Sequence, residues 1–340
     1  MEKNTLLKST ALPAFSKIKK KDMHSAMKHL VAENQKIVKN IEKLKILTWN
    51  NFIYKLEESD DKISKAWAPI RHLNSVMNDK EIRIEYEKSL SLLTSHYSKI
   101  GQNKNLFSQY EKFYEQNKKK LNKSQNKLLE NTLRGFRLSG VHLDNRKRKL
   151  FRNYQERLAK LESKFEQNIL DSSNSWSKNF KTNKALSGMP QSSLEIAAET
   201  ASRNKQDGYT LKLDQPCYMA VMTFAHSQNL RKTLYLAYAS RASKEFPVSN
   251  KWDNTKNIEE ILTLRQTMSK ILGYKNYAEY SLATKMANST NEVIKFLDNL
   301  KIKAKSKSKK EITLLKQYAR KKLNMKSINP WDIAYIAEKY

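Results

Sequence analysis

The sequence predicts a mostly α-helical protein with a small patch of β-structure, and three observations support this fold class. The 340-residue chain has only six glycines and six prolines, too few for a β-sandwich, a propeller or a collagen-like chain. Apolar side chains recur at three- and four-residue steps through most of the sequence, as on the buried face of a helix. One stretch, Tyr209–Leu213, instead alternates apolar and polar residues, which predicts a strand.

The first part of the chain is predicted to form consecutive helices. The longest uninterrupted pattern follows Asp144, and its apolar stripe is expected to pack in a helical core. That stripe consists of Leu150, Tyr154, Leu158, Leu161, Phe165 and Ile169. The expected helices before it cover residues 22–47, 60–77 with a bend at Pro69, 79–97, 106–114 and 124–140, the last capped by Ser124.

The middle of the chain carries the predicted β-structure. A turn at 186–190 leads into a short helix from Pro190 to Arg203, and Asp207-Gly208 then introduces the strand Tyr209–Leu213. The segment Trp176–Thr182 is a candidate partner. We therefore expect a two- to three-stranded patch near 176–213.

The last third is predicted to be helical again. Helices are expected from Pro216, from Asn229, over 258–272 with Asn254 as cap and Gly273 as terminator, and over 290–323. The sequence Asn-Pro-Trp-Asp at 329–332 begins a final helix, in which Ile333, Ile336 and Tyr340 form an apolar face with nothing after it to cover that face. This pattern predicts a chain cut from a longer protein. The predicted regions are 1–145, helical, and 146–340, helical with the β patch and leading into a domain that is absent.

The high positive charge of the chain suggests binding to nucleic acid, but the type and distribution of the basic residues do not favour this function. The formal net charge is +31, from 65 basic and 34 acidic residues, but 52 of the basic residues are Lys and only 13 are Arg. Specific recognition of phosphates and bases favours the planar fork of Arg, and the lysines are spread along the chain. A basic all-α protein that binds acidic partners or nucleic acid is therefore the alternative, with no specific nucleic acid expected.

The expected location is the cytoplasm. The single cysteine, Cys217, cannot form an internal disulfide. The N-terminal sequence lacks the pattern of a signal peptide, and no apolar run approaches 18 residues, so no membrane association is predicted.

No catalytic or metal-binding residues can be assigned from side-chain chemistry. None of the six histidines is followed by Glu and no two are four residues apart, so no His-Glu-x-x-His helix is present. His29 and Glu33 are expected to form an exposed ion pair. Cys217 lies in the first turn of a helix without a histidine placed as its base, which favours a small buried residue over a nucleophile. The acidic cluster at 57–61 is interpreted as a solvated helix end.

Nine short stretches, taken together and in order, show a family resemblance. They are ALPAFSKI at 11–18, HLNSVMN at 72–78, FRLSGV at 136–141, NILD…W at 168–176, LSGMP at 186–190, AYASRAS at 237–243, KWDNTKNIEEILTLR at 251–265, LGYKNYAEYSLATKMA at 272–287 and NPWDIAYIAEK at 329–339. The chain closely resembles the N-terminal half of the thimet oligopeptidase family of zinc metallopeptidases.

The resemblance implies a two-lobed, mostly α-helical enzyme with a deep channel that admits short peptides. In this family zinc is held by two histidines of a His-Glu-x-x-His helix and a downstream glutamate, all of which follow the Pro-Trp-Asp segment. The resemblance therefore implies a zinc cofactor in the intact enzyme, with none of its ligands supplied by this chain. Tyr209, Leu211 and Leu213 are the candidate residues of a substrate-channel wall, because a strand edge can pair with an extended peptide.

Three hypotheses follow. The chain is an N-terminal fragment that is inactive by itself, a subunit completed by a separate C-terminal-half chain and then acting on short peptides, or a basic binding protein. If helices here normally pack against a missing half, the isolated chain should be loose and sensitive to proteases near its C-terminus.

Overall fold

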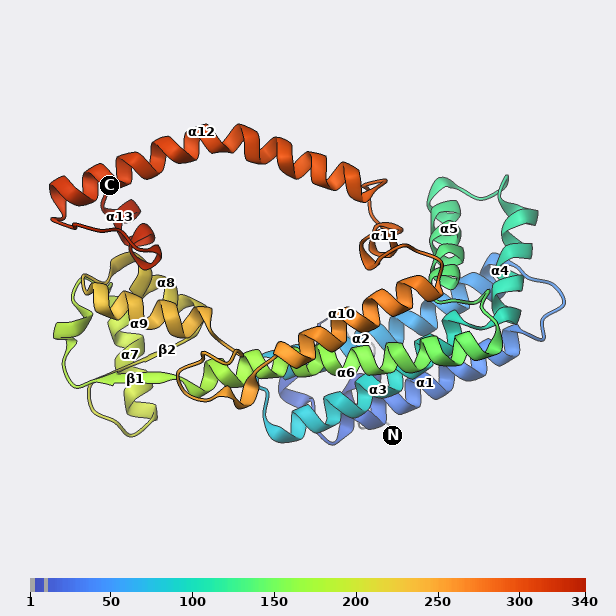
Figure 1. Cartoon of the computed structure of the whole chain (residues 1–340). Helices are drawn as coiled ribbons and strands as arrows, with labels where there is room; N and C mark the ends of the chain where they lie inside the picture. The colour runs from blue at the N-terminus through green and yellow to red at the C-terminus, as the bar shows by residue number, and fades with distance from the viewer. Residues whose placement is uncertain (1–3, 9–11) are drawn as a thin grey trace. The chain divides into compact units, whose positions relative to one another are not determined.

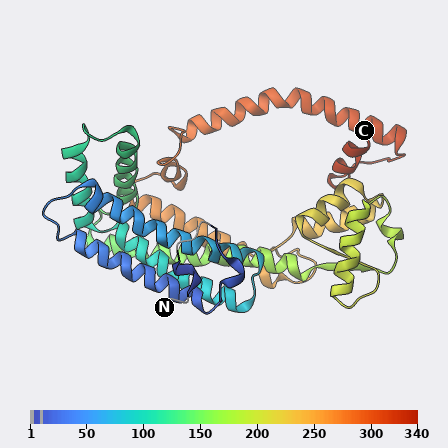
Figure 2. The same ribbon diagram turned by 180° about the vertical axis from the view of Figure 1, so that it is seen from behind.

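The computed structural model describes residues 4–8 and 12–340 and divides the chain into two compact units (Figure 1; Figure 2 gives the view from behind). Unit 1 consists of Met1–Glu162 and Thr263–Tyr277, and unit 2 consists of Ser163–Leu262 and Ala278–Tyr340. The described part contains thirteen α-helices and one two-stranded sheet, which confirms the predicted fold class. No helix within it combines the length and the apolar character needed to cross a bilayer.

Unit 1 is a bundle of helices with two neighbouring apolar cores. One core lies among α1, α2 and α3 and includes Met27 and Ile70, and the other lies among α1, α2, α4 and α5 and includes Phe52 and Leu129. The helices that build the bundle are α1 (Asp22–Ile41), α2 (Tyr54–Val76), α3 (Lys80–Gly101), α4 (Lys104–Asn117), α5 (Lys123–Leu138) and the first part of α6 (Asn145–Ser175).

Side-chain caps set where these helices begin. The Asp79 carboxylate accepts the Ile82 N–H at 3.0 Å before α3, and Asn103 caps α4 in the same way. The cap of helix α5 lies two residues earlier than predicted, because Asn122, and not Ser124, forms a reciprocal capping box with Gln125.

Helix α2 differs more from the prediction. A π-helical turn at Trp49–Ile53, capped by Thr48, runs directly into α2, which therefore begins at Tyr54 and not at residue 60. Pro69 lies inside this helix and is buried. As a result the acidic residues at 57–61 belong to the body of a helix.

The stripe on α6 is only partly buried. Leu161 is 4% exposed, but Leu150 is 40% exposed and its neighbour Phe151 is fully buried against Met268 of α10 (Thr255–Ile271). The expectation of a continuous core stripe was therefore wrong at Leu150, because the partner helix covers the adjacent position.

Unit 2 contains the small sheet and the helices that cover it. Strands β1 (Ser177–Phe180) and β2 (Tyr209–Lys212) are antiparallel, with Ser177 opposite Lys212 and Phe180 opposite Tyr209, which confirms a two-stranded patch. The core beneath them includes Leu211, Leu213, Val221 and Leu234. The helices around this core are α7 (Gln191–Arg203), α8 (Gln215–Phe224) and α9 (Gln228–Ala239).

The remaining elements follow the predicted order. Helix α10 ends two residues before Gly273, whose φ of 89° lies in the left-handed region. Ser227, and not Asn229, caps α9. Short helix α11 (Tyr277–Leu282) precedes the long α12 (Thr290–Lys322), and a 3₁₀ turn at Pro330–Asp332 opens α13 (Ile333–Lys339).

Helix α13 is not the uncovered element that its sequence suggests. Ile336 is fully buried and Tyr335 is 9% exposed, because both pack against the C-terminal part of α12 at Ala319. Ile333 and Tyr340 remain 41% and 66% exposed. The prediction of an open face was therefore wrong at Ile336, since α12 folds back over that side of the helix.

Candidate functional site

The predicted channel-wall residues lie in the sheet of unit 2. Leu211 and Leu213 are each 1% exposed and point into the core shared with α7, α8 and α9, whereas Tyr209 is half-buried. Their side chains therefore stabilise the unit's own core. A role of this strand along a peptide channel stays a prediction that only its backbone edge and Tyr209 could fulfil.

A second candidate surface is the exposed apolar face of α12. Phe296, Leu297 and Leu300 are 60%, 56% and 49% exposed. Leu297 precedes Leu315, and Leu300 precedes Tyr318, by 18 residues or about five helical turns, so all four lie on one side of the helix. Leu315 and Tyr318 are the positions that α13 covers. One apolar face of α12 is thus covered at its C-terminal end and open at its N-terminal end.

The segment that covers the C-terminal end of α12 is held in place by a buried ion pair. The Arg231 guanidinium on α9 contacts the Asp332 carboxylate at 2.7 Å, with both side chains at most 1% exposed. Arg231 also donates to the Ala225 carbonyl at 2.6 Å and lies over the Tyr335 ring at 4.1 Å. Gln228 donates to the second Asp332 oxygen at 2.8 Å. These contacts join α13 to the rest of unit 2.

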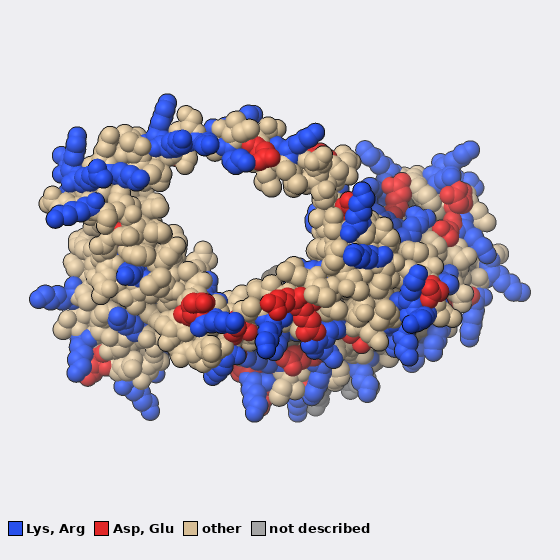
Figure 3. Space-filling model, in the orientation of Figure 1, with Lys and Arg blue, Asp and Glu red and all other residues tan. Residues whose placement is uncertain are grey.

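The basic side chains do not form one concentrated patch. Lys and Arg are scattered over both units on the face in Figure 3, with Asp and Glu among them, and they also run along α12. Several are in i, i+3 or i, i+4 pairs, for example Lys301 with Asp298 at 2.7 Å. This distribution is typical of solvated helix faces and does not favour a specific nucleic-acid site.

The residues present do not fit a zinc site of the kind that the resemblance implies. No group of three or more His, Cys, Asp or Glu side chains in the described residues is arranged to hold a metal ion. His29 and Glu33 lie 3.5 Å apart on the surface of α1, as predicted for a simple pair. Burial raises the pKa of the Cys217 thiol to about 11, which keeps it protonated and disfavours a nucleophilic role.

The acidic cluster at 57–61 lies within α2, where Ser59 is 5% exposed and Glu57 and Asp60 line a cavity. The interpretation as a helix end was wrong, because it placed the beginning of the helix at residue 60. Glu57, Glu58 and Asp61 are nevertheless exposed, as expected for solvated carboxylates. The spacing of Glu57 and Asp60, one turn apart, was the signal that could have found them.

Comparisons with known proteins identify relatives of this chain among peptidases. Two family models match, "Neurolysin/Thimet oligopeptidase, N-terminal domain" over residues 27–148 and "Peptidase family M3" over residues 221–340. Oligopeptidase A of Haemophilus influenzae is 39% identical over 99% of this chain and 50% of that protein, and oligopeptidase A of Escherichia coli is 37% identical with the same coverage. "Probable cytosolic oligopeptidase A" of Arabidopsis thaliana is 29% identical over 100% of this chain and 49% of its own length. The chain thus spans about half the length of the curated relatives it matches.

Proposed function

The chain is homologous, along almost its whole length, to the N-terminal half of oligopeptidase A of peptidase family M3, and we propose that it supplies the substrate-channel lobe of a zinc oligopeptidase for short peptides. In this proposal the zinc site belongs to the C-terminal half, since the described residues offer no ligand set for it. The chain by itself is then inactive. It acts in the cytoplasm, a location supported by the name of the Arabidopsis relative, "Probable cytosolic oligopeptidase A".

The open face of α12 is the observation that carries the proposal. Phe296, Leu297 and Leu300 expose adjacent apolar surface on a helix whose same side is covered by α13 further along. Such a face is expected to bind a partner. Because the relatives are twice as long as this chain, we assign the C-terminal half of the oligopeptidase as that partner.

The test is hydrolysis of a short quenched-fluorescent peptide with added zinc. We expect no activity from this chain alone, none from a separately folded C-terminal half of a bacterial oligopeptidase A, and activity when the two are mixed. Chelation should abolish that activity. Hydrolysis by this chain alone, or none from the mixture of two folded halves, would refute the proposal.

A matched pair of α12 variants ties the result to the proposed surface. Leu297→Glu places a charge on the open face, whereas Ile302→Glu places one five residues later, on the other side of the helix, where Ile302 is 67% exposed. Association of the two halves, measured by ultracentrifugation, should be lost with Leu297→Glu and retained with Ile302→Glu. Equal behaviour of the two variants would remove this face from the interface.

A further inference from the structure

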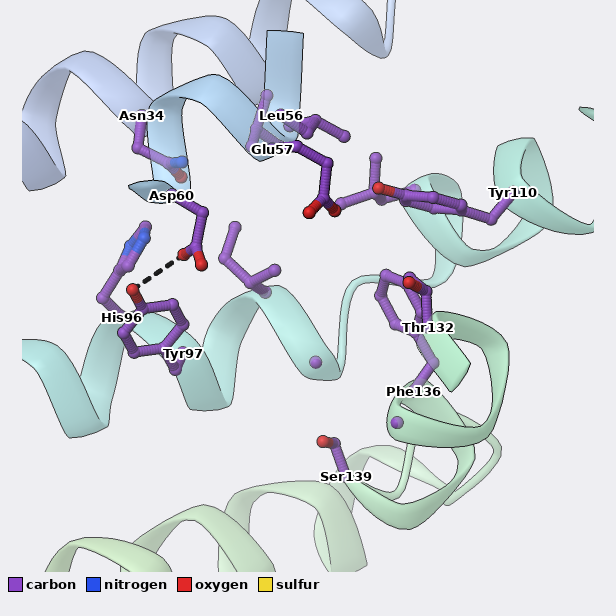
Figure 4. A pocket seen from close by; sticks show the side chains of 15 residues that line it. Asn34, Leu56, Glu57, Asp60, His96, Tyr97, Tyr110, Thr132, Phe136 and Ser139 are labelled. Atoms are coloured by element: carbon purple, nitrogen blue, oxygen red, sulfur yellow. Dashed lines mark hydrogen bonds between the residues drawn. The ribbon is translucent and has the colours of Figure 1, made fainter. Parts of the chain in front are cut away.

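A cavity of about 310 Å³ lies among the helices of unit 1 and has no part in the function proposed above. Its lining comes from α1 through α5, and its apolar side includes Leu56 and Phe136 (Figure 4). The volume is at the lower end of the range for small-ligand sites. The cavity therefore has room for a side chain or a small organic group.

Two carboxylates give this cavity its charge. Glu57 is exposed at the cavity's edge and Asp60 is half-buried, and both extend from α2 towards the same space (Figure 4). Tyr97 donates a hydrogen bond to Asp60 at 2.8 Å. No ion pair joins either carboxylate to a Lys, Arg or His side chain among the described residues. Two carboxylates without basic partners are a strong local feature in a chain of net charge +31.

A buried histidine in the same cavity independently indicates a ligand. His96 is 3% exposed, lines the cavity beside Asp60, and its Nε2 has no hydrogen-bond partner among the described residues (Figure 4). Buried polar atoms in native proteins are almost always paired. Burial lowers the pKa of His96, so the ring is neutral at pH 7 and keeps one nitrogen as an acceptor.

The pKa of Glu57 shows what a cation would contribute. Partial desolvation at the cavity's edge, and then the charge of Asp60, raises the pKa of this exposed carboxyl group. A positively charged group beside both carboxylates would offset these two effects. The cavity thus favours a cationic ligand over a neutral one.

The arrangement of the acceptor groups favours a guanidinium over a metal ion. Glu57, Asp60 and His96 do not converge as a metal-binding group would, because no such group of three forms in the described part of the chain. A guanidinium carries five N–H donors on a flat fork several ångströms wide. It also stacks on aromatic side chains, which Tyr97, Tyr110 and Phe136 provide around the cavity.

A second cavity of about 550 Å³ adjoins the first. Asp60, Tyr97 and Ser139 line both cavities, and the second is also lined by Trp67 and Leu90. The two together offer more length than a single guanidino compound needs. Their adjacency favours a guanidinium carried on a longer molecule.

We propose that the two cavities bind an arginine residue of an extended peptide, with the guanidinium among Glu57, Asp60 and His96 and a flanking residue beside Trp67. The site belongs to unit 1 by itself and is independent of whether the chain completes a peptidase. Because the chain's net charge of +31 repels cationic peptides in general, saturable binding of one requires a local acidic site.

The test is calorimetric titration of the full chain with an acetylated, amidated pentapeptide that has a central arginine. We expect saturable binding, at least about tenfold weaker when citrulline, a neutral isostere, replaces arginine. Agmatine, the free guanidino compound, should bind more weakly than the peptide. Equal binding of the arginine and citrulline peptides, or no binding of either, would overturn the proposal, and agmatine binding as tightly as the peptide would overturn its peptide part.

Three variants locate the site. Glu57→Gln and Asp60→Asn should each weaken binding at least about fivefold, whereas Glu58→Gln, which removes an exposed carboxylate outside the cavity lining, should leave it unchanged. A loss with Glu58→Gln as large as with Glu57→Gln would indicate general surface charge and would refute the site.

A fourth variant tests the cavity without changing charge. Gly135 of α5 lines it, and a Cβ there would meet no atom within 4 Å. Gly135→Leu should therefore fill part of the space, keep or raise the melting temperature, and abolish peptide binding. Unchanged affinity in this folded variant would contradict the proposal.

Discussion

The Arg231–Asp332 pair joins the C-terminal segment of unit 2 to α9. Both groups are buried, and Asp332 also accepts from Gln228 and from the Asn329 N–H at 3.0 Å. A buried charge that loses its partner keeps its full desolvation cost. The pair therefore specifies the position of α13 more than it adds net stability.

Asp332→Asn should lower the free energy of unfolding by about 3–5 kcal/mol, because it leaves the Arg231 guanidinium buried without a counter-charge. Urea unfolding monitored by tryptophan fluorescence measures the change, and Trp331 lies in the affected segment. The matched control, Asp298→Asn, breaks the exposed pair with Lys301 and should cost under about 1 kcal/mol. Similar losses in the two variants would contradict this account of α13.

The same pair predicts a pH dependence. Burial by itself raises the pKa of Asp332, but hydrogen bonds from Arg231, Gln228 and Asn329 outweigh it and hold the pKa below the ordinary value of 3.8. The stability that the ionised carboxylate contributes is therefore complete above about pH 4 and is lost as the pH falls through the lower, folded-state pKa. Unfolding curves between pH 6 and pH 2.5 should show the wild-type chain converging on Asp332→Asn only at the acid end. A constant difference across this range would refute the sign of the shift.

At the scale of elements, the β1–β2 pair depends on one backbone position. Gly208 has φ 87°, and a Cβ there would lie 2.1 Å from the Phe180 carbonyl oxygen on the paired strand. Gly273, after α10, has nearly the same φ but no atom within 4 Å of its Cβ position. Substitution of Gly273 therefore tests backbone strain alone, whereas substitution of Gly208 tests strain together with a steric clash against the paired strand.

Gly273→Ala should cost about 1–2 kcal/mol, the strain of a left-handed residue. Gly208→Ala should cost clearly more, because the strands must also separate. Thermal unfolding of the two variants provides the comparison. Equal melting temperatures would show that the strands shift without cost.

The middle of helix α12 is more exposed than the segment that follows the helix. Residues 301–311 are all exposed, whereas Asp332, Tyr335 and Ile336 are buried. Segments with little buried surface open locally at low free-energy cost. The structure therefore moves the expected weak point from the C-terminal segment to the middle of α12.

Limited trypsin digestion of the chain should cut first at the lysines from Lys301 to Lys310, with the segment 329–340 protected. Mass spectrometry of the early fragments identifies the sites, and addition of a C-terminal oligopeptidase half should slow the cuts in α12. Early loss of 329–340 would instead support the original expectation of a loose C-terminus.

The helical class, the order of the elements and the family relationship all follow from local patterns in the sequence. Periodicity, capping residues and turn signals act over a few neighbouring residues, so they predict α3, β2 and the Gly273 terminus without knowledge of distant contacts. The motif stretches likewise need no three-dimensional information.

Tertiary structure alone decided which faces are buried and which groups meet. Phe151 is buried where Leu150 was expected because α10 covers that side of α6, and α12 covers Ile336. The cavity at Glu57, Asp60 and His96 is lined by residues as far apart in the sequence as Asn34 and Ser139. Contacts of this kind depend on how the helices pack, and local sequence patterns do not predict that packing.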